Sequence, residues 1–356
     1  MLFAPGTIIW EDMEALYKRN INWNRLYGKS VFITGAYGML ASYAVYMLIF
    51  LNETVENSKI DIYACGRDEQ KAKSRFGNYM DKPYFHFIKS SLDNPNIIEQ
   101  HYDFIIHAAS KASSQYYATD PIGVITPNVF GTYYILNNLK HYRCESMLYI
   151  SSGEVYGAVD EEKVDEHMFG SSDCLDIRNC YGESKRMGEC LCKCFSEQYK
   201  IPVKIVRLGH TYGPTMDIYH DKRVFSEFVG NVVNGQNIAI KSSGHAMRAF
   251  CYAADAVAAF YMVLLSGENG EAYNISNYSG LISIKDLAKC LTELYPEKKL
   301  KVEYTSREVG EAYIESRQEK HAVPSTKRLE GLGWSADYSV QVGFKRTIES
   351  FLRSEK

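Results

Sequence analysis

The sequence feature that most constrains the fold is a short apolar run, residues 30–34, that ends in the glycine-rich stretch 35–41. This stretch reads GAYGMLA, a G-x-x-G-x-x-A pattern, and it leads into an apolar, helix-like segment. The first glycine permits a tight turn, the second lets a pyrophosphate approach the backbone, and the alanine allows a helix to pack closely on a strand. Because N–H groups at a helix start bind phosphates, the pattern predicts a dinucleotide site formed by Gly35, Tyr37, Gly38 and Met39.

Further apolar runs alternate with helix-like stretches along the chain. The expected strands are residues 60–65, 85–88, 104–108, 147–151 and 203–208, and the main expected helices are residues 68–76, 128–140 and 181–198. Such alternation over about 200 residues is typical of βαβ units. The sequence therefore predicts an α/β fold, with a doubly wound parallel sheet of Rossmann type and a smaller, irregular α/β substrate-binding region.

We expect three segments in the chain. Residues 1–28 form an N-terminal extension, helical at residues 11–20, that packs on the main domain or on a partner subunit. Residues 29–210 form the dinucleotide-binding Rossmann domain, to which a later strand and helix return near residues 245–265. Residues 211–356 form mainly the substrate-binding region, and ligands are expected in the cleft between the two regions.

Composition narrows the class of protein. The net charge of −3 argues against a general binder of nucleic acid or of membrane surfaces. The nine cysteines form no C-x₂-C pairs, so we expect free thiols, no disulfide framework and no metal site. The N-terminus lacks the pattern of a signal peptide, and the most apolar stretch, residues 43–51, is about half as long as a membrane span. A cytoplasmic protein is expected.

The candidate reactive pair is Tyr181 and Lys185, which lie four residues apart and therefore on one face of a predicted helix. A phenol is a poor base at neutral pH because its ordinary pKa is about 10. A neighbouring ammonium and a positively charged nicotinamide would stabilise the phenolate and lower that pKa. Lys185 is also expected to hold the nicotinamide ribose.

Two further candidates, Ser152 and Glu154, follow the expected strand at residues 147–151. Side chains at the carboxyl end of such a strand point into the cofactor crevice. A serine hydroxyl there can share the proton of a substrate hydroxyl, and a carboxylate can act as a base or accept a hydrogen bond.

The choice of dinucleotide depends on the end of the second expected strand. NAD-binding sites usually carry an acidic residue there, whereas this chain has Cys65, Gly66 and Arg67, followed by Asp68. Arg67 could stack on adenine or meet a 2′-phosphate. NAD is the expected cofactor, and NADP remains an alternative.

Together the glycine loop, Ser152, Tyr181 and Lys185 resemble the extended short-chain dehydrogenase/reductase family of nucleotide-sugar epimerases, dehydratases and decarboxylases. The resemblance spans residues 29–351. The segments most similar to UDP-glucuronic acid decarboxylases are residues 107–113, 120–122, 128–132, 151–157, 178–186, 223–228 and 248–252. The resemblance implies an NAD-dependent enzyme for a nucleotide-linked sugar, active in cell-surface polysaccharide biosynthesis.

The resemblance also implies roles for individual residues. Tyr181 would take the proton of the sugar O4 while hydride leaves C4, so that a 4-keto sugar forms. Glu154 would lie near C5, which the ketone makes acidic. The other implied contacts are Ala108 to the cofactor, Ser113 to the substrate, Arg223 to the nucleotide, and Arg248 to the sugar diphosphate or a C6 carboxylate.

Departures from the family patterns bear on the exact reaction. The 4,6-dehydratases carry an Asp-Glu pair where this chain has Gly153 and Glu154, and simple 4-epimerases carry small or hydroxyl residues at Glu154. The decarboxylases carry arginine and asparagine where this chain has Thr215 and His210, which indicates a changed substrate pocket.

The favoured reaction is decarboxylation of a nucleotide-linked uronic acid. The alternatives are 4,6-dehydration, 4-epimerisation and, in a different class, a dinucleotide-binding sensor without catalysis. The resemblance also implies a homodimer, and a stripe on the predicted helix at residues 181–198 is compatible with that contact or with ordinary core packing. The stripe consists of Met187, Cys190, Leu191 and Cys194.

Overall fold

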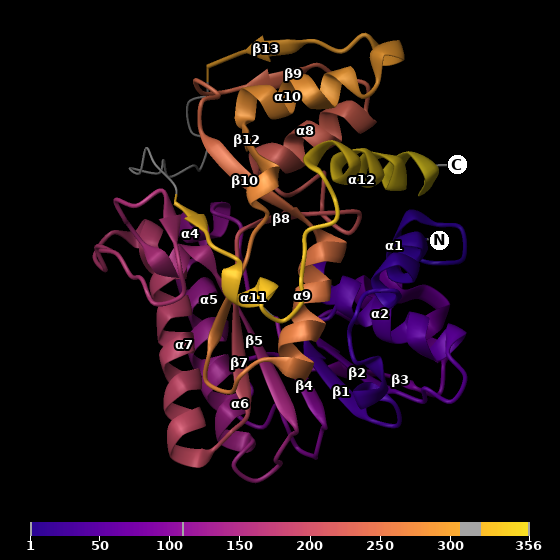
Figure 1. The fold of residues 1–356 in the computed structure, drawn as a ribbon, viewed down its shortest axis with the longest axis vertical. Helices are drawn as coiled ribbons and strands as arrows, with labels where there is room; N and C mark the ends of the chain where they lie inside the picture. Colours follow the sequence, from indigo (N-terminus) through magenta and orange to yellow (C-terminus); the bar gives the residue numbers. More distant parts are fainter. Residues whose placement is uncertain (1, 109, 307–321, 355–356) are drawn as a thin grey trace.

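The computed structural model describes residues 2–108, 110–306 and 322–354 (Figure 1). Its centre is a parallel sheet of seven strands in the order β11-β7-β5-β4-β1-β2-β3. The strands are β1 (Ser30–Thr34), β2 (Asp61–Gly66), β3 (Phe85–Lys89), β4 (Phe104–His107), β5 (Ser146–Ser152), β7 (Val203–Leu208) and β11 (Ala272–Ile275). This arrangement confirms the predicted doubly wound sheet of Rossmann type.

Helices cover both faces of the sheet (Figure 1). One face carries α2 (Met39–Thr54) and α9 (Ala253–Ser266), and the other carries α5 (Pro121–Thr126), α6 (Thr132–Asn138) and α7 (Cys180–Tyr199). Every residue of α2 from Leu40 to Leu51 is buried, because this helix also packs against α9 and the N-terminal helix. The apolar stretch at residues 43–51 is therefore part of the core.

No helix in the described part of the chain combines the length and the apolar character that crossing a bilayer requires.

The helix expected at residues 128–140 begins earlier in the structure. Asp120 caps α5 by accepting a hydrogen bond from the backbone of Gly123 (3.1 Å), and Pro121 occupies the first turn. Pro127 lacks the N–H that a continuous α-helix would need, and the chain passes through a π-helical turn (Pro127–Gly131) into α6. Apolar periodicity alone does not reveal the first two turns, because they contain Pro121, a glycine and three β-branched apolar residues, none of which favours a helix interior.

The chain returns to the Rossmann sheet later than expected. Helix α9 lies in the expected range and packs on the sheet, but the returning strand is β11, beside β7. Strand β10 (Met247–Tyr252) instead belongs to a three-stranded sheet with β8 (His210–Tyr212) and β12 (Leu281–Ser283). The smaller region thus begins inside the range assigned to the Rossmann domain.

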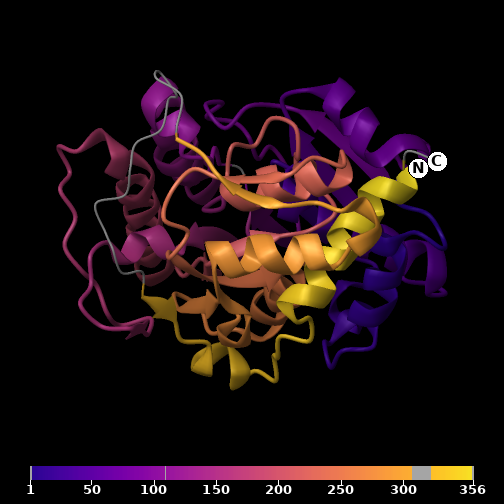
Figure 2. The ribbon, with the colours of Figure 1, turned by 90° about the horizontal axis from the view of Figure 1, so that it is seen from above.

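The smaller region lies across one end of the Rossmann sheet (Figures 1 and 2). It contains α8 (Val224–Val233), α10 (Ile284–Glu293), α12 (Val340–Ser354), and the strands β9 (Ile238–Ile240) and β13 (Val302–Tyr304). A short pair of strands, β6 (Lys163–Val164) and β14 (Val323–Pro324), joins the loop before α7 to the C-terminal part of the chain. The remaining short helices are α3 (Glu69–Phe76), α4 (Gln115–Thr119) and α11 (Lys327–Glu330).

The N-terminal extension forms helix α1 (Ile8–Tyr17), which packs against α2, α9 and α12. Its Asp12 is fully buried and accepts hydrogen bonds from the hydroxyls of Tyr43 and Tyr252 (2.6 Å to Tyr252). Arg346 of α12 also donates to this carboxylate, from Nε at 2.9 Å. One side chain therefore connects the extension, the dinucleotide-binding helix, the small sheet and the C-terminal helix.

We expect Asp12→Ala to lower the free energy of unfolding by about 3–5 kcal/mol, because it leaves the buried hydroxyls of Tyr43 and Tyr252 without an acceptor and removes one of the two carboxylates that pair with Arg346. Urea denaturation followed by circular dichroism measures this loss. Lys18→Ala, on the exposed end of the same segment, is the matched control and should change stability by less than about 0.5 kcal/mol. An equal effect of the two substitutions would contradict a special role for Asp12.

Candidate active site

The dinucleotide loop has the geometry that its sequence predicts. Strand β1 ends at Thr34, Gly35 adopts a φ of +61°, and the N–H of Gly38 donates to the carbonyl of Gly35 (2.8 Å). A Cβ on Gly38 would lie only 3.0 Å from that carbonyl oxygen. Within the described residues, no side chain caps the start of α2. Its first N–H groups are therefore available to a pyrophosphate.

The expected adenosine end of the site lies at the end of β2. The ring of Tyr37 covers Gly66, where any Cβ would overlap the ring. Arg67 is exposed. Asp68 caps α3 by accepting hydrogen bonds from Gln70 (3.0 Å) and Lys71 (3.1 Å). The carboxylate of Asp68, the acidic residue that follows this strand, is therefore hydrogen-bonded to the backbone of α3. The ring of Tyr37 forms the surface beside Gly66.

The four predicted catalytic residues lie together where β5 ends and α7 begins. Tyr181 and Lys185 are both buried on one face of α7. Gly182 allows this helix to approach Glu154, because a Cβ there would lie 3.0 Å from the Glu154 carbonyl oxygen. Ser152, the last residue of β5, accepts a hydrogen bond from the backbone of Glu154 (3.2 Å). The Glu154 side chain is exposed.

Burial raises the pKa of Tyr181 to about 12. Its neighbours act in both directions, since the Ser152 hydroxyl and the Arg223 charge lower this pKa and the Glu154 charge raises it. The phenol therefore needs a further positive charge close by to act as a base near neutral pH. Lys185 is one such charge, and its own pKa is lowered by burial to about 7.

Two contacts of the reactive tyrosine were not predicted from the sequence. The ring of Tyr117, in α4, stacks on Tyr181 with centroids 5.4 Å apart and planes inclined by 13°. The buried hydroxyl of Ser110 lowers the pKa of Tyr181. No spacing rule connects Tyr117 or Ser110 to Tyr181, because the contacts form only when separate segments of the chain meet at the sheet edge.

The remaining predicted residues lie at separate places in the structure. Ala108 directly follows β4, and its N–H donates to the Thr34 hydroxyl (3.1 Å). His210 and Arg248 line one small pocket on β8 and β10. Ser113 is half-buried at the start of α4, where its carbonyl accepts from Tyr116 (3.0 Å).

Thr215 occupies a different place from these residues. It is buried, its hydroxyl donates to the carbonyl of Met39 (2.8 Å), and its own carbonyl accepts from Arg75 (3.1 Å). The Thr215 side chain therefore joins the smaller region to the dinucleotide loop, and a substrate contact for it stays a prediction.

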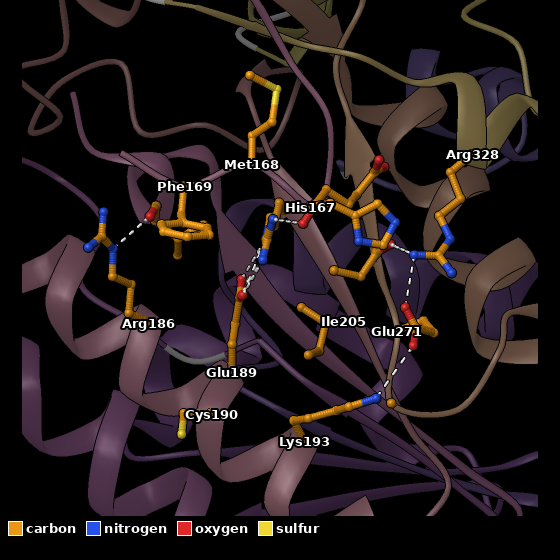
Figure 3. Close-up of a pocket in the computed structure, with 15 residues that line it drawn as sticks. His167, Met168, Phe169, Arg186, Glu189, Cys190, Lys193, Ile205, Glu271 and Arg328 are labelled. Atoms are coloured by element: carbon orange, nitrogen blue, oxygen red, sulfur yellow. Dashed lines mark hydrogen bonds and ion pairs between the residues drawn. The ribbon is translucent and has the colours of Figure 1, made fainter. Parts of the chain in front are cut away.

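A pocket of about 620 Å³ is lined on one side by Arg186, Glu189, Cys190 and Lys193 of α7 (Figure 3). It contains none of the predicted site residues, and several of its charged groups are paired with one another. Arg207 forms an ion pair with Glu189 at 2.7 Å, and Arg328 forms one with Glu271 at 2.9 Å. We place the active site at the carboxyl ends of the strands, because the dinucleotide loop and Tyr181 lie there.

Comparison with known proteins agrees with this geometry. Residues 31–276 match the model of the NAD dependent epimerase/dehydratase family. The chain belongs to this family. Its cofactor is accordingly NAD, and the resemblance seen in the sequence is confirmed.

Individual relatives differ in their named reactions. The chain is 30% identical to UDP-glucuronic acid decarboxylase 5 of Arabidopsis thaliana, over 90% of this chain and 89% of the relative. It is 29% identical to dTDP-D-glucose 4,6-dehydratase of Homo sapiens, over 91% and 90% of the two chains. The fold is similar to that of the UDP-glucose 4-epimerase of Thermotoga maritima, with a TM-score of 0.77, 20% identity, and coverage of 92% and 100%.

The low pKa of Lys185 predicts a pH-dependent contribution to stability in the cofactor-free protein. Burial holds this pKa at about 7 in the folded chain, below the ordinary value of 10.5. Between these two values the unfolded chain carries a proton that the folded chain lacks, so stability rises with pH across this window. Below a pH of about 7, Lys185 is charged in both the folded and the unfolded chain, so the full free-energy cost of burying its charge lowers the stability of the folded protein.

We expect Lys185→Met to remove this dependence. The stability of the unsubstituted protein minus that of the variant should increase by more than about 1 kcal/mol between about pH 7 and about pH 9. Urea denaturation at a series of pH values measures the difference. A flat or falling difference would show that Lys185 is charged throughout this range.

Proposed function

We propose that this protein decarboxylates a nucleotide-linked uronic acid through transient oxidation of the sugar at C4. The observation that carries the proposal is the position of Glu154, whose charge acts on Tyr181 while glycine occupies the adjacent position 153. A dehydratase of this family would need a second acid beside Glu154. The similarity to both named decarboxylases and named dehydratases does not separate the two reactions by identity alone.

Three residues would carry out the proton transfer that accompanies oxidation at C4. Tyr181, as a phenolate, removes the proton of the sugar O4, and the Lys185 ammonium stabilises the phenolate. Ser152 shares this hydrogen bond. NAD, which the loop at Gly35 and Gly38 and the side chain of Lys185 would hold, would supply the acceptor for the hydride of C4 and would make this hydride available again after the carboxylate has left. The Tyr181 phenol then returns the proton to O4.

The chemistry after oxidation depends on the sugar itself. A ketone at C4 accepts the electron pair that is released when the bond from C5 to the carboxylate carbon breaks and carbon dioxide leaves. A proton then replaces the carboxylate at C5, and Glu154, whose charge acts on Tyr181, would control the delivery of this proton. Arg248 and His210 share one pocket and would contact the carboxylate or the diphosphate.

Arg223 is the proposed nucleotide contact. Its guanidinium is held by Asp221 and lies 4.8 Å from the ring of Phe225, and its charge reaches Tyr181. An arginine fixed in this way can donate to a phosphate without first losing much side-chain freedom.

The direct test is to incubate the purified protein with UDP-glucuronate and, separately, with UDP-, dTDP-, CDP- and GDP-hexoses. Mass spectrometry of the products should show the loss of carbon dioxide from the uronic acid. Loss of water from a hexose would instead establish the dehydratase, and inversion without a change in mass would establish the epimerase. Tyr181→Phe should reduce turnover of the accepted substrate roughly 10²–10⁴-fold, and its full activity would contradict the catalytic assignment.

We also propose that two copies associate through the face formed by α6 and α7. Met187 (49% exposed), Cys190 and Cys194 point outward from α7, and Leu191 is half-buried. The neighbouring helical segment adds the exposed rings of Phe130 (52%) and Tyr133 (42%). Exposed apolar side chains on two neighbouring helical segments are typical of an interface between subunits.

We expect Met187→Glu to convert a dimer into a monomer, because a carboxylate at the centre of this face would be buried without a partner. Sedimentation velocity measures the change. Tyr304→Glu, at an exposed site in the smaller region, is the control and should leave the dimer intact. A monomeric unsubstituted protein would rule out this interface.

A further inference from the structure

The side chain of Lys185 is enclosed in an unusual way for a buried cation. It is 2% exposed, and its ammonium donates one hydrogen bond to the carbonyl of Ile150 (2.7 Å). Among the residues that the structure describes, no carboxylate forms an ion pair with it. The ammonium lies 4.9 Å from the ring centroid of Tyr149, the residue before Ile150 on β5.

The Tyr149 ring is held rigidly in this place. It is fully buried, and its hydroxyl fits only because residue 188 of α7 is glycine, since a Cβ there would overlap the hydroxyl oxygen. The ring also contacts the imidazole of His107, with centroids 5.6 Å apart.

The imidazole of His107, which contacts the Tyr149 ring, is held by hydrogen bonds and is uncharged. His107 is hydrogen-bonded to Thr34 (2.8 Å) and to Thr132 (3.1 Å), and burial lowers its pKa to about 3. Thr132 donates to the carbonyl of Asn128 (2.6 Å), so Nε2 of His107 must carry the proton that is donated to Thr132. The His107 side chain that contacts the Tyr149 ring is therefore neutral.

We propose that Tyr149 is a positioning residue, whose ring face holds the Lys185 side chain in its charged form and directs it toward Tyr181. The inference rests on the proposed role of Tyr181 as the base. A cation over an aromatic face is attracted by the ring quadrupole, and the attraction is strongest where water is excluded. Leucine or methionine at this position would fill the space without providing that attraction.

Other groups near Lys185 do not replace the ring. On α7, Glu189 raises the pKa of Lys185 but is engaged by Arg207, and Cys192 is buried with its thiol pKa raised. On β4, His107 is neutral. On α7, Tyr181 lies 6.0 Å from the ammonium and is the group to be activated. Desolvation outweighs the favourable charges, and the pKa of Lys185 falls to about 7.

The test compares Tyr149→Phe, which keeps the ring, with Tyr149→Met, which removes the ring and preserves much of the volume. The readout is the pKa of Lys185 in the full-length chain with NAD bound, followed by NMR of lysine labelled with carbon-13 at Cε. The Lys185 signal is identified by its absence from Lys185→Met. We expect Tyr149→Met to lower this pKa by about one unit, and Tyr149→Phe to change it by less than about 0.3.

Activity on the accepted sugar provides the second readout. At neutral pH, kcat should fall about fivefold in Tyr149→Met and less than about twofold in Tyr149→Phe, since a fall of one unit from a pKa of about 7 reduces the charged fraction of Lys185 from about one half to about one tenth. Tyr261→Met, at a buried tyrosine of α9 remote from this site, controls for general loss of packing. Thermal denaturation confirms that each variant is folded.

The two readouts separate this inference from the proposed function. If no nucleotide sugar is turned over but the pKa of Lys185 falls in Tyr149→Met, the proposed function fails and the role of Tyr149 stands. If Lys185 titrates identically in Tyr149→Met and in the unsubstituted protein, the role of Tyr149 is overturned, whichever sugar is accepted. An equal shift in Tyr149→Phe and Tyr149→Met would overturn it as well, because the ring would then not be the cause.

Discussion

The buried carboxylate of Asp12 is the interaction on which the placement of the two regions depends. It receives hydrogen bonds from α2, from the small sheet and from α12, and so it sets α2 relative to the smaller region. The first turn of α2 is also the dinucleotide loop, and Thr215 bonds to that turn at Met39. The expected cofactor site and the substrate-binding region are therefore both fixed to α2, through Asp12 and through Thr215.

Within that frame, the reactive groups owe their properties mainly to exclusion from water. Burial raises the pKa of Tyr181 and lowers that of Lys185, so each residue alone favours its neutral form. An ion pair of phenolate and ammonium is favourable only if the two charges form together. A bound nicotinamide adds a positive charge near the phenolate, and a sugar hydroxyl supplies the proton to be removed. The reaction is therefore limited to the site that holds both cofactor and substrate.

The fold was largely predictable from the sequence, and the site only in part. Each expected strand of the large sheet lies within one residue of its observed bounds, because strands buried on both faces appear as continuous apolar runs. The loop at Gly35 and the pair Tyr181–Lys185 follow local spacing rules. Tyr117, Ser110 and the Tyr149 ring could not be predicted in this way, since their roles arise from contacts between distant segments. Strand β11 was missed because it has only four residues and lies after the range in which the chain was expected to return to the sheet.

The contact between Tyr37 and Gly66 has an evolutionary consequence. Any side chain at position 66 would displace the tyrosine ring, while a small residue at position 37 would leave the end of β2 uncovered. Neither position can change freely without the other, so a lineage could alter this end of the cofactor site only by paired substitution. The two positions, separated in sequence but adjacent in space, should vary together among homologous chains.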